Sequence, residues 1–574
     1  MVKRRSHRWR LQPPPPELIQ QLSQRHQIPA LVAQILLNRG LVEARDIDSF
    51  LEPTLGHLQS PHNLADLPAA VERLTRAVLA REPIIIYGDY DVDGLTATAV
   101  LRLFLEAVGA SVVSYIPNRL TQGYGLHGPA LTGLAAKGRL VVTVDCGISN
   151  TQEVAQARDL GLDVIVTDHH EPPTTLPPAL AVINPKRPDC SYAYKDLAGV
   201  GVALNLVLGL RTRLREMGWF NRRPEPNLKE YLDLVALGTA ADVSPLTGVN
   251  RILVSQGLRV LAESRRPGLQ ALKEVAGLAN GPLSLRDVVF RLAPRLNAAG
   301  RLGQTGAALE LLLTDDGQQA RQLALSLDRL NRERQAEQAA ILAAAEEQIQ
   351  RHGWQNQPAL VLAAAGWHPG IIGIVAAKLV ERYHRPVALI SLDGEVGRGS
   401  ARSMEPFDLY AGLSACQEYL LQFGGHAAAA GFTLAANQVD RFREALLAQV
   451  AQVLGEGLLD PELILDAEVN LNQLDDEFFH HLNRLRPFGP GNPSPVVACL
   501  QSQLLDSWIV ANEHLKIRFA QNGKISTAIA FDQARLHPLR GNFDLALSPR
   551  ISFYQGRPQP ELQVLDLGPA PTRV

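Results

Sequence analysis

Three short apolar runs, each followed at once by acidic residues, place the strongest constraint on how this chain folds. The runs cover residues 83–87, 140–144 and 163–167, and they are followed by Gly88-Asp89, by Asp145 and by Asp168-His169-His170. A helical pattern comes after each run, and repeated strand–loop–helix units predict a parallel sheet with helices on both faces. Ligands bind such sheets at the carboxyl ends of the strands. We therefore expect all three acidic clusters to lie at that edge.

The rest of the chain divides into segments of different pattern. Residues 318–350 contain neither Gly nor Pro and predict one long connecting helix, and a second α/β unit follows with strand candidates at 359–364 and 387–391. After a segment rich in Pro and Gly at 486–495, alternating runs predict a small β-barrel like an OB-fold. We expect five parts: a helical lead-in (1–75), a catalytic α/β domain (76–317), the connecting helix (318–352), a substrate-binding α/β domain (353–460) and the barrel (461–574).

Composition narrows the class of protein. The 574 residues include 46% hydrophobic ones, which is enough to form cores, and 56 Lys+Arg against 58 Asp+Glu give a net charge of −2. This balance argues against a strongly basic, histone-like binder, although a local basic groove is compatible with these numbers. The four cysteines lie far apart with no CxxC, which favours a reducing compartment. The apolar stretch 359–379 is interrupted at 367–370 and carries Lys378, so we expect a cytoplasmic protein without a membrane span. A monomer is the default expectation for its oligomeric state.

The first acidic cluster is the most informative motif. Asp89, Asp91 and Asp93 alternate directly after a strand of buried type, and such concentrated negative charge favours binding of Mg²⁺, Mn²⁺ or Ca²⁺. An EF-hand loop needs Glu where this chain has Val100. An EF-hand loop also follows a helix, whereas the acidic cluster here follows a predicted strand. An aspartyl-phosphate enzyme with a DxDxT motif needs Thr where this chain has Leu95. A solvated acidic turn is the third alternative.

The other acidic clusters weaken that third alternative. Asp145, Asp168-His169-His170 and Asp242 each end an apolar segment. Four or five carboxylates with one or two imidazoles suit two divalent ions about 3.5–4 Å apart, as in many phosphoester hydrolases.

Several motifs together resemble the DHH phosphoesterase family. The motifs are residues 89–94, 144–147, 168–170 and 238–243, and residues 424–431 are similar to the GGHxxAAG signature of the DHHA1-type domain of that family. Residues 292–301 and 486–495 are similar to the branch of the family that degrades single-stranded DNA. The resemblance covers roughly residues 75–568 and implies two α/β domains, of the DHH and DHHA1 types, joined by the long helix.

The resemblance implies a metal centre with two Mn²⁺ or Mg²⁺ ions. Its ligands would be Asp91, Asp93, Asp145, His169 and Asp242. Many members have a His four residues before the position of Asp91, where this chain has Tyr87, a poorer ligand, and Asp89 is a candidate to replace it. Asp168 is expected to orient His169. His170 is expected to act in catalysis by donating to the scissile phosphate.

A second set of residues is expected to bind the nucleic acid. Residues 399–403 resemble the GSGRS motif of the family, with Ala401 in place of a Gly, and would hold a 5′-terminal phosphate; an ordinary loop is the alternative. Small residues at 298–300 would let a DNA strand approach flanking polar side chains; plain surface charges on a helix are the alternative there. The candidates are Arg295, Asn297, Arg301, Ser400, Arg402, Ser403 and His426. In the barrel, Phe519, Phe553 and Tyr554 are candidates for stacking on bases. For each of them, a place in the core of the barrel is the favoured alternative.

The resemblance implies a single-strand-specific 5′→3′ exonuclease that releases 5′-mononucleotides in DNA repair and recombination. A helicase and a single-strand-binding protein are natural partners of such an enzyme. Two alternatives stay open: a phosphodiesterase of oligoribonucleotides or small nucleotides, and a non-catalytic scaffold that binds single strands. A scaffold would be expected to have lost carboxylates, yet Asp91, Asp93, Asp145 and Asp242 are all present.

Overall fold

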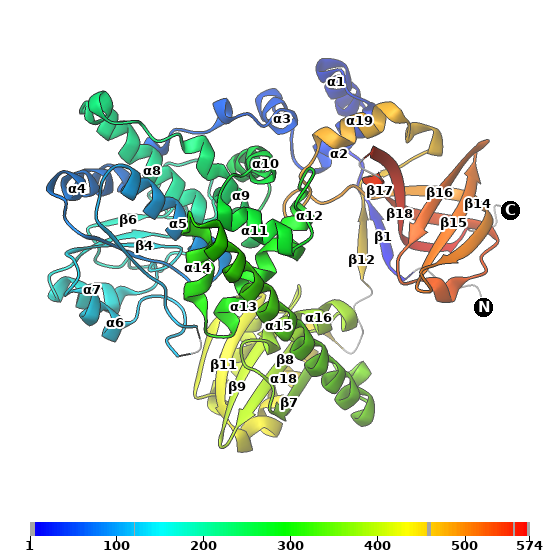
Figure 1. Ribbon diagram of the computed structural model, residues 1–574. Coiled ribbons are helices and arrows are strands. Elements are labelled where there is room, and N and C mark those ends of the chain that lie inside the picture. Colours follow the sequence, from blue (N-terminus) through cyan, green and yellow to red (C-terminus); the bar gives the residue numbers. More distant parts are fainter. Residues whose placement is uncertain (1–5, 120, 456–460, 555–556, 571–574) are drawn as a thin grey trace. The chain divides into compact units, whose positions relative to one another are not determined.

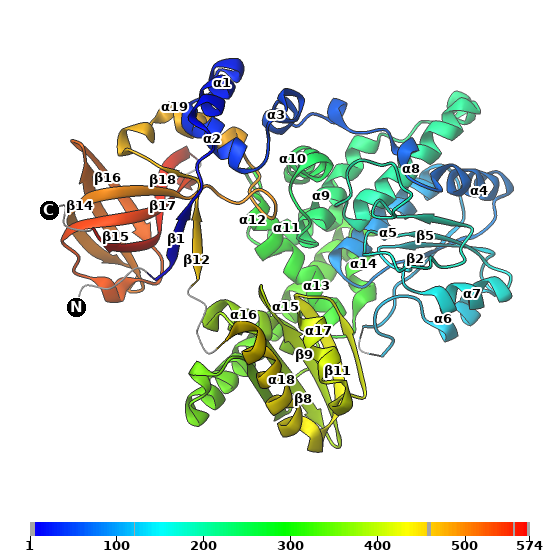
Figure 2. The ribbon, with the colours of Figure 1, turned by 180° about the vertical axis from the view of Figure 1, so that it is seen from behind.

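The computed structural model describes residues 6–119, 121–455, 461–554 and 557–570, without the side chains of 553, 554, 557 and 558. Two compact units are present (Figures 1 and 2). The first comprises residues 1–300, 304–327 and 462–574, and the second comprises residues 301–303 and 328–461. In the described part of the chain, no helix is both long and apolar enough to cross a bilayer.

The predicted parallel sheet lies in the first unit. Its strands are β2 (Ile84–Tyr87), β3 (Val112–Tyr115), β4 (Leu140–Val144), β5 (Asp163–Thr167) and β6 (Ala181–Ile183), in the order β3-β2-β4-β5-β6. Every pair in this sheet is parallel. The central strands β2 and β4 are buried along their whole length and are apolar apart from Thr143, because both of their faces are covered.

Helices cover both faces of this sheet. Helices α4 (Leu67–Ala80), α5 (Val92–Ala107) and α8 (Gly199–Glu216) lie on one face, and α6 (Gly128–Leu134) and α7 (Thr151–Asp159) lie on the other (Figures 1 and 2). Further helices follow along the chain: α9 (Leu232–Ala241), α10 (Gly248–Ala262), α11 (Pro267–Val275), α12 (Leu285–Asp287), α13 (Ala293–Arg301) and α14 (Thr305–Leu313). A π-helical turn, Val288–Leu292, leads into α13.

The long helix and the second α/β fold are also present. Helix α15 spans Gly317–His352, and its residues from Asp328 onward belong to the second unit. The sheet of that unit has the order β10-β11-β9-β8-β7, with strands β7 (Leu360–Ala365), β8 (Val387–Asp393), β9 (Val396–Arg402), β10 (Gln422–Gly425) and β11 (Ala429–Ala435). Helices α15 and α16 (Ile372–Tyr383) pack on one face, and α17 (Leu409–Ala415) and α18 (Val439–Leu454) pack on the other.

The C-terminal strands close into the predicted barrel. They are β14 (Val497–Val510), β15 (His514–Gln521), β16 (Lys524–Ala530), β17 (Gly541–Tyr554) and β18 (Arg557–Pro569), and pairing of β14 with β17 completes the ring. The short strand β13 (Ala467–Glu468) pairs with β14. Phe519 is fully buried and therefore belongs to the core. The side chains of Phe553 and Tyr554 lie outside the described residues.

The helical lead-in packs on the far end of the chain. Helices α1 (Pro16–His26), α2 (Ala30–Asn38) and α3 (Ala44–Leu51) share one hydrophobic core with the barrel and with α19 (Asp476–Arg484). A strand inside the lead-in, β1 (Arg8–Leu11), pairs in parallel with β12 (Glu462–Leu465). Sequence patterns predict these helices but not their packing partner, which is more than 400 residues away along the chain.

A buried arginine of helix α10 connects helix α3 with residues 484–486, which precede the barrel. Arg251 of α10 is 1% exposed, and its guanidinium lies 3.7 Å from the centre of the Phe50 ring. Its nitrogen atoms donate hydrogen bonds of 2.8–3.0 Å to the carbonyl oxygens of Phe50, Arg484, Leu485 and Arg486. One side chain thus satisfies the backbone of two segments that are distant in sequence.

We expect Arg251→Met to destabilise the first unit by about 3 kcal/mol, because buried carbonyls would lose their charged donor. The midpoint of thermal unfolding should fall by several degrees. Arg259→Met is the matched control, since Arg259 lies exposed on the same helix, and it should change stability by less than about 0.5 kcal/mol. Equal melting curves for both variants would contradict this role of Arg251.

Candidate metal centre

The acidic motifs converge at the carboxyl ends of the parallel strands. Asp89 follows β2, Asp145 follows β4 and His169 follows β5, whereas Asp242 follows the last residue of helix α9. Among these motifs, three groups have ligand atoms within 4.8 Å of one another: Asp93, His169 and Asp242; Asp89, Asp91 and Asp145; and Asp145, His169 and His170. The structure thus brings together every side chain predicted to bind metal.

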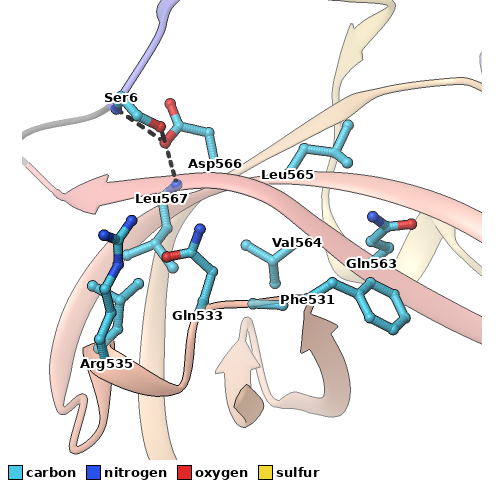
Figure 3. Close-up of a pocket in the computed structure, with 11 residues that line it drawn as sticks. Ser6, Phe531, Gln533, Arg535, Gln563, Val564, Leu565, Asp566 and Leu567 are labelled. Carbon is cyan, nitrogen blue, oxygen red and sulfur yellow. Dashed lines mark hydrogen bonds between the residues drawn. The ribbon is translucent and has the colours of Figure 1, made fainter. Parts of the chain in front are cut away.

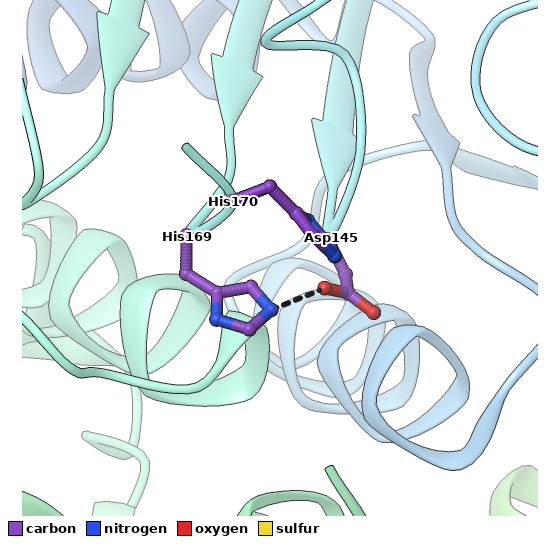
Figure 4. Close-up of side chains that lie close together, drawn as sticks. All are labelled: Asp145, His169 and His170. Atoms are coloured by element: carbon purple, nitrogen blue, oxygen red, sulfur yellow. Dashed lines mark ion pairs between the residues drawn. The ribbon is translucent and has the colours of Figure 1, made fainter. Parts of the chain in front are cut away.

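His169 lies among three of these carboxylates. Its Nε2 is 3.1 Å from Oδ1 of Asp145, 3.8 Å from Oδ2 of Asp93 and 4.0 Å from Oδ1 of Asp242. Figure 4 shows the ring directed toward Asp145. Burial lowers the pKa of His169 and outweighs the opposite effect of Asp242. The ring therefore favours the neutral form, which is the form that binds metal ions.

Buried negative charge accumulates in the cluster. The pKa values of Asp89, Asp93 and Asp145 are raised well above the ordinary value of 3.8. Burial is the largest cause, and repulsion from neighbouring carboxylates is the next. Like charges this close disfavour joint ionisation unless a cation neutralises them.

The donor set fits divalent metal ions. Oδ1 of Asp89, Oδ1 of Asp145 and Nε2 of His169 are buried atoms without a hydrogen-bond partner among the described residues. Buried polar atoms are rarely left in this state, so each calls for a specific explanation. Carboxylate oxygens combined with imidazole nitrogen suit Mn²⁺ and, with fewer nitrogen ligands, Mg²⁺. Asp145 and His169 each belong to two of the three groups, which suits a centre of two ions.

Two aspartates are fixed by helix N-termini. Asp91 is the N-cap of α5, and its Oδ1 accepts a hydrogen bond of 3.1 Å from the N–H of Gly94. Asp93 accepts from the backbone N–H groups of Gly199 (2.6 Å) and Val200 (2.9 Å), at the start of α8. These N–H groups have no partner within their own helix, so the carboxylates satisfy them and are held in place.

The backbone near Asp145 is tightly constrained. Asp145 itself has a φ of 62°, which lies in the left-handed region that non-glycine residues seldom adopt. A Cβ atom on Gly199 would lie 2.7 Å from Oδ1 of Asp145, so only glycine fits there. Val243, directly after Asp242, also has a left-handed φ of 65°. Strained residues of this kind concentrate at functional sites.

Tyr87 does not take the place of a ligand. Its side chain is fully buried, and its hydroxyl donates to the carbonyl oxygen of Gly125 at 3.2 Å. Asp89, in contrast, belongs to the group with Asp91 and Asp145, and its Oδ1 has no hydrogen-bond partner among the described residues. This arrangement supports Asp89 as the replacement for the missing histidine.

Asp168 does not orient the ring of His169 as predicted. Its Oδ1 pairs with Nδ1 of His170 at 2.7 Å and also accepts the backbone N–H of His169 at 2.7 Å. The expectation is wrong because the carboxylate of Asp168 meets the ring of His170 and only the backbone of His169. Burial alone would lower the pKa of His170, but the hydrogen bond with Asp168 and nearby carboxylates raise it to about 9. His170 thus favours the cationic form, which suits donation to a phosphate oxygen.

Two residues at the centre were missed by sequence reasoning. The hydroxyl of Ser244 donates to Oδ2 of Asp242, two residues earlier in the chain, so nearness in sequence is the only signal that could have found it. The hydroxyl of Tyr124 donates to the backbone oxygen of Asp145 at 3.2 Å and lies 3.0 Å from Nδ1 of His170. Tyr124 comes from a loop with no distinctive pattern, so only the fold reveals it.

The candidate phosphate-binding residues lie in the second unit. Ser400 and Arg402 lie in strand β9, so the alternative of an ordinary loop is wrong for residues 399–402, and Ser403 directly follows the strand. A Cβ on Gly373 would be 2.8 Å from Oγ of Ser400 and 3.0 Å from Nη2 of Arg402, so both side chains approach the first turn of α16. Helix N-termini attract anions, which supports this assignment.

Ser403 and His426 lie next to the same strand. The hydroxyl of Ser403 donates to the carbonyl oxygen of Phe407 at 2.9 Å, so this group is already engaged. The backbone N–H of Ser403 donates to the carbonyl of Ala428, which brings it beside the exposed turn that carries His426. The prediction that both side chains bind a phosphate stays a prediction.

Helix α13 differs from expectation. Ala298, Ala299 and Gly300 are buried and thus do not face a nucleic acid, because their small size serves packing inside the protein. The carboxamide oxygen of Asn297 accepts the N–H of Val92 at 3.1 Å. Nη1 of Arg295 donates to the carbonyl of Arg291. In the second unit, Arg301 donates to the carbonyl of Gly370 at 3.0 Å.

A cavity of about 250 Å³ lies in the barrel and is separate from the acidic cluster (Figure 3). Phe531, Gln533 and Arg535 line it together with Asp566. The carboxylate of Asp566 accepts hydrogen bonds from the hydroxyl of Ser6 (2.6 Å) and from Nε1 of Trp9 (2.8 Å). Asp566 therefore anchors the start of the described chain.

Three segments of the chain match the models of known protein domains. Residues 83–239 match the N-terminal domain of the DHH family, residues 356–452 match the DHHA1 domain and residues 465–566 match the RecJ OB domain. The chain is 38% identical to the single-stranded-DNA-specific exonuclease RecJ of Escherichia coli, over 94% of this chain and 95% of that protein. It is 37% identical to RecJ of Bacillus subtilis, over 97% of this chain and 70% of that protein. The chain belongs to the RecJ family.

A solved RecJ structure has the same fold. RecJ from Thermus thermophilus in complex with Mn²⁺ superposes with a TM-score of 0.84 at 33% identity, covering 99% of this chain and 80% of that one. RecJ from the same organism was also solved in complex with Mg²⁺. In the present chain, the DHH match contains Asp89, Asp145 and His169 but ends before Asp242. The RecJ-like segment of α13 lies outside all three matched domains.

Proposed function

We propose that this chain is a metal-dependent exonuclease that digests single-stranded DNA from the 5′ end and releases 5′-mononucleotides. The observation that carries the proposal is the buried cluster around His169, in which carboxylate and imidazole atoms lack hydrogen-bond partners among the described residues. RecJ proteins named as single-stranded-DNA-specific exonucleases are its relatives over nearly the full chain.

The proposed metal ligands are the residues of the cluster. Two ions, Mn²⁺ or Mg²⁺, would be held by Asp89, Asp91, Asp93, Asp145, His169 and Asp242. Bound ions of this kind activate water and neutralise charge on a phosphoryl group. The protein contributes fixed carboxylates, since backbone N–H groups hold Asp91 and Asp93 and Ser244 holds Asp242.

His170 has a separate role. Its ring is 46% exposed in contrast to the buried ring of His169, and Asp168 keeps it cationic near neutral pH. A cationic ring at the edge of the cluster can donate to a non-bridging oxygen of the scissile phosphate. Its proton is held at Nδ1 by Asp168, which leaves Nε2–H for the substrate.

The 5′→3′ direction of digestion would be set by a phosphate-binding site in the second unit. Arg402, Ser400 and the first turn of α16 offer donors to a terminal phosphate, and Ser403 and His426 border the same strand. We infer that a 5′-phosphate binds there. A site that recognises a chain end favours an exonuclease over an endonuclease.

Cellular context is part of the same proposal. All four cysteines are free and buried, which supports a reducing, cytoplasmic location. An enzyme restricted to single strands depends on other proteins to expose them, so we infer a helicase and a single-strand-binding protein as partners in repair and recombination. We propose that the enzyme itself acts as a monomer.

One assay tests reaction, substrate and polarity together. The protein is incubated with Mn²⁺ and a 3′-labelled single strand, beside the corresponding duplex and a copy with a blocked 5′ end. We expect stepwise shortening of the unblocked single strand alone. Cleavage of short oligoribonucleotides or cyclic dinucleotides without digestion of the long strand would indicate a small-nucleotide phosphodiesterase. Binding of the strand without any cleavage would indicate a scaffold.

A further inference from the structure

Helix α13 contacts the segment that carries Asp91 and Asp93 through residues that are not themselves predicted metal ligands. The carboxamide oxygen of Asn297 accepts the backbone N–H of Val92 at 3.1 Å. Val92 is the first residue of α5 and lies between Asp91 and Asp93, two of the clustered carboxylates. Asn297 is 205 residues away from Val92 along the chain, so this contact depends on the tertiary fold.

A second contact lies one turn further along α13. Gly300 is buried, and a Cβ atom on it would lie 2.8 Å from the carbonyl oxygen of Tyr90. The helix therefore approaches the backbone of the loop directly, and residues on both sides of Asp91 are in contact with it. Ala298 and Ala299 are fully buried beside these contact points.

The contact satisfies a specific need of the loop. The first N–H groups of a helix have no acceptor within the helix, and Val92 provides one of them. Asp91, as N-cap, already accepts from Gly94 with Oδ1. Val92 is 1% exposed, so water is a poor substitute for the oxygen of Asn297. Loss of that acceptor would release the backbone between the two carboxylates.

We propose that Asn297 is a positioning residue for the metal centre, holding Asp91 and Asp93 at the spacing that divalent ions require. This inference rests on the proposed metal-dependent function. It differs from the sequence-based prediction for Asn297, because the oxygen of the side chain is engaged with the protein backbone and not directed to a nucleic acid. Groups that hold metal ligands in place commonly change metal affinity tenfold to about a hundredfold when they are removed.

Measurements of metal affinity and of DNA affinity distinguish a positioning role of Asn297 from a role as a DNA contact. We compare Asn297→Ala and Asn297→Leu, which lack the acceptor, with Asn297→Asp, which keeps an oxygen at the same position. Titration calorimetry with Mn²⁺ alone, without DNA, should show affinity reduced at least about tenfold in the Ala and Leu variants. The Asp variant should bind Mn²⁺ within about threefold of the parent chain. Fluorescence anisotropy with a labelled single strand in EDTA should show unchanged DNA affinity in all three.

The outcomes are distinct. Unchanged Mn²⁺ affinity in both the Ala and the Leu variant would overturn the positioning role, and reduced DNA affinity together with unchanged Mn²⁺ affinity would make Asn297 a DNA contact. Should the parent chain itself fail to bind Mn²⁺, both this inference and the proposed function are wrong. Should it bind Mn²⁺ yet leave single strands intact, only the proposed function fails, and the comparison of variants still decides the role of Asn297. Melting curves in EDTA identify any variant that does not fold. If either the Ala or the Leu variant fails to fold, the other variant still tests the role of Asn297.

Discussion

Asp145→Asn is expected to reduce hydrolysis of single-stranded DNA by at least about a thousandfold while leaving single-strand binding within about twofold of the parent chain. Asp145 belongs to two of the three groups of ligand atoms, so its loss affects both. Its Oδ1 is 3.1 Å from His169 and has no hydrogen-bond partner in the described residues. The amide side chain keeps the shape of the carboxylate but loses the charge that attracts a cation.

The measurement is the rate of release of labelled nucleotides at saturating Mn²⁺, together with strand binding in EDTA. Asp159→Asn is the matched control, since Asp159 is exposed at the end of α7 and should leave the rate unchanged. Equal rates for Asp145→Asn and the parent chain would remove Asp145 from the metal centre. A parallel loss of strand binding would instead indicate a role in holding DNA.

Chelation of divalent ions is expected to abolish hydrolysis and to destabilise the first unit, and these two effects share one cause. Burial and mutual repulsion raise the pKa of Asp89, Asp93 and Asp145 above their ordinary value of 3.8. A carboxyl group whose pKa is raised in the folded state binds protons more tightly there than in the unfolded state. In EDTA, these groups therefore contribute stability at low pH, and that contribution is lost as the pH rises from about 4 through their raised pKa values.

Mn²⁺ should reverse this loss at neutral pH. A ligand at a hundred times its dissociation constant stabilises the folded state by about 2.7 kcal/mol. Asp145→Asn provides the diagnostic comparison: without metal at neutral pH it should melt at a higher temperature than the parent chain, because one buried charge is gone. With Mn²⁺ it should gain less than the parent chain gains.

Differential scanning calorimetry across pH, with EDTA or with Mn²⁺, checks both expectations. Asp159→Asn again serves as the control and should follow the parent chain in every condition. A melting temperature of the chelated parent chain that does not fall relative to Asp145→Asn between acidic and neutral pH would contradict the electrostatic account. An absence of any Mn²⁺-dependent shift in the parent chain would contradict the metal centre itself.

Local pattern was sufficient for the parallel sheet and for the grouping of the acidic motifs. The central strands are mainly apolar runs, and each is followed by acidic residues within a few positions. Since the carboxyl ends of parallel strands meet at one edge, the sequence order alone implies that Asp89, Asp145 and His169 come together. The long helix α15 was equally accessible, because its span contains no residue that breaks a helix after Gly317.

Roles that depend on side-chain direction were less accessible. The order Asp168-His169-His170 suggests a carboxylate behind a ligating imidazole, yet the turn after β5 pairs Asp168 with His170. The small residues at 298–300 suggest room for DNA, yet they allow α13 to pack on the loop at Tyr90. In both cases the sequence shows the residue types, and backbone geometry decides which atoms they meet.

The sequence by itself determined the parallel sheet, the long helix and the set of residues at the edge of the sheet, because strand and helix patterns and turn positions are local properties. Only the tertiary structure decided which partners hold those residues: Asn297 on Val92, Gly199 on Asp93 and Arg251 on the segment before the barrel. It also decided that the lead-in shares a core with the barrel. These contacts join residues separated by about a hundred to several hundred positions, and their free energy comes from burial and hydrogen bonding that exist only once the chain has folded.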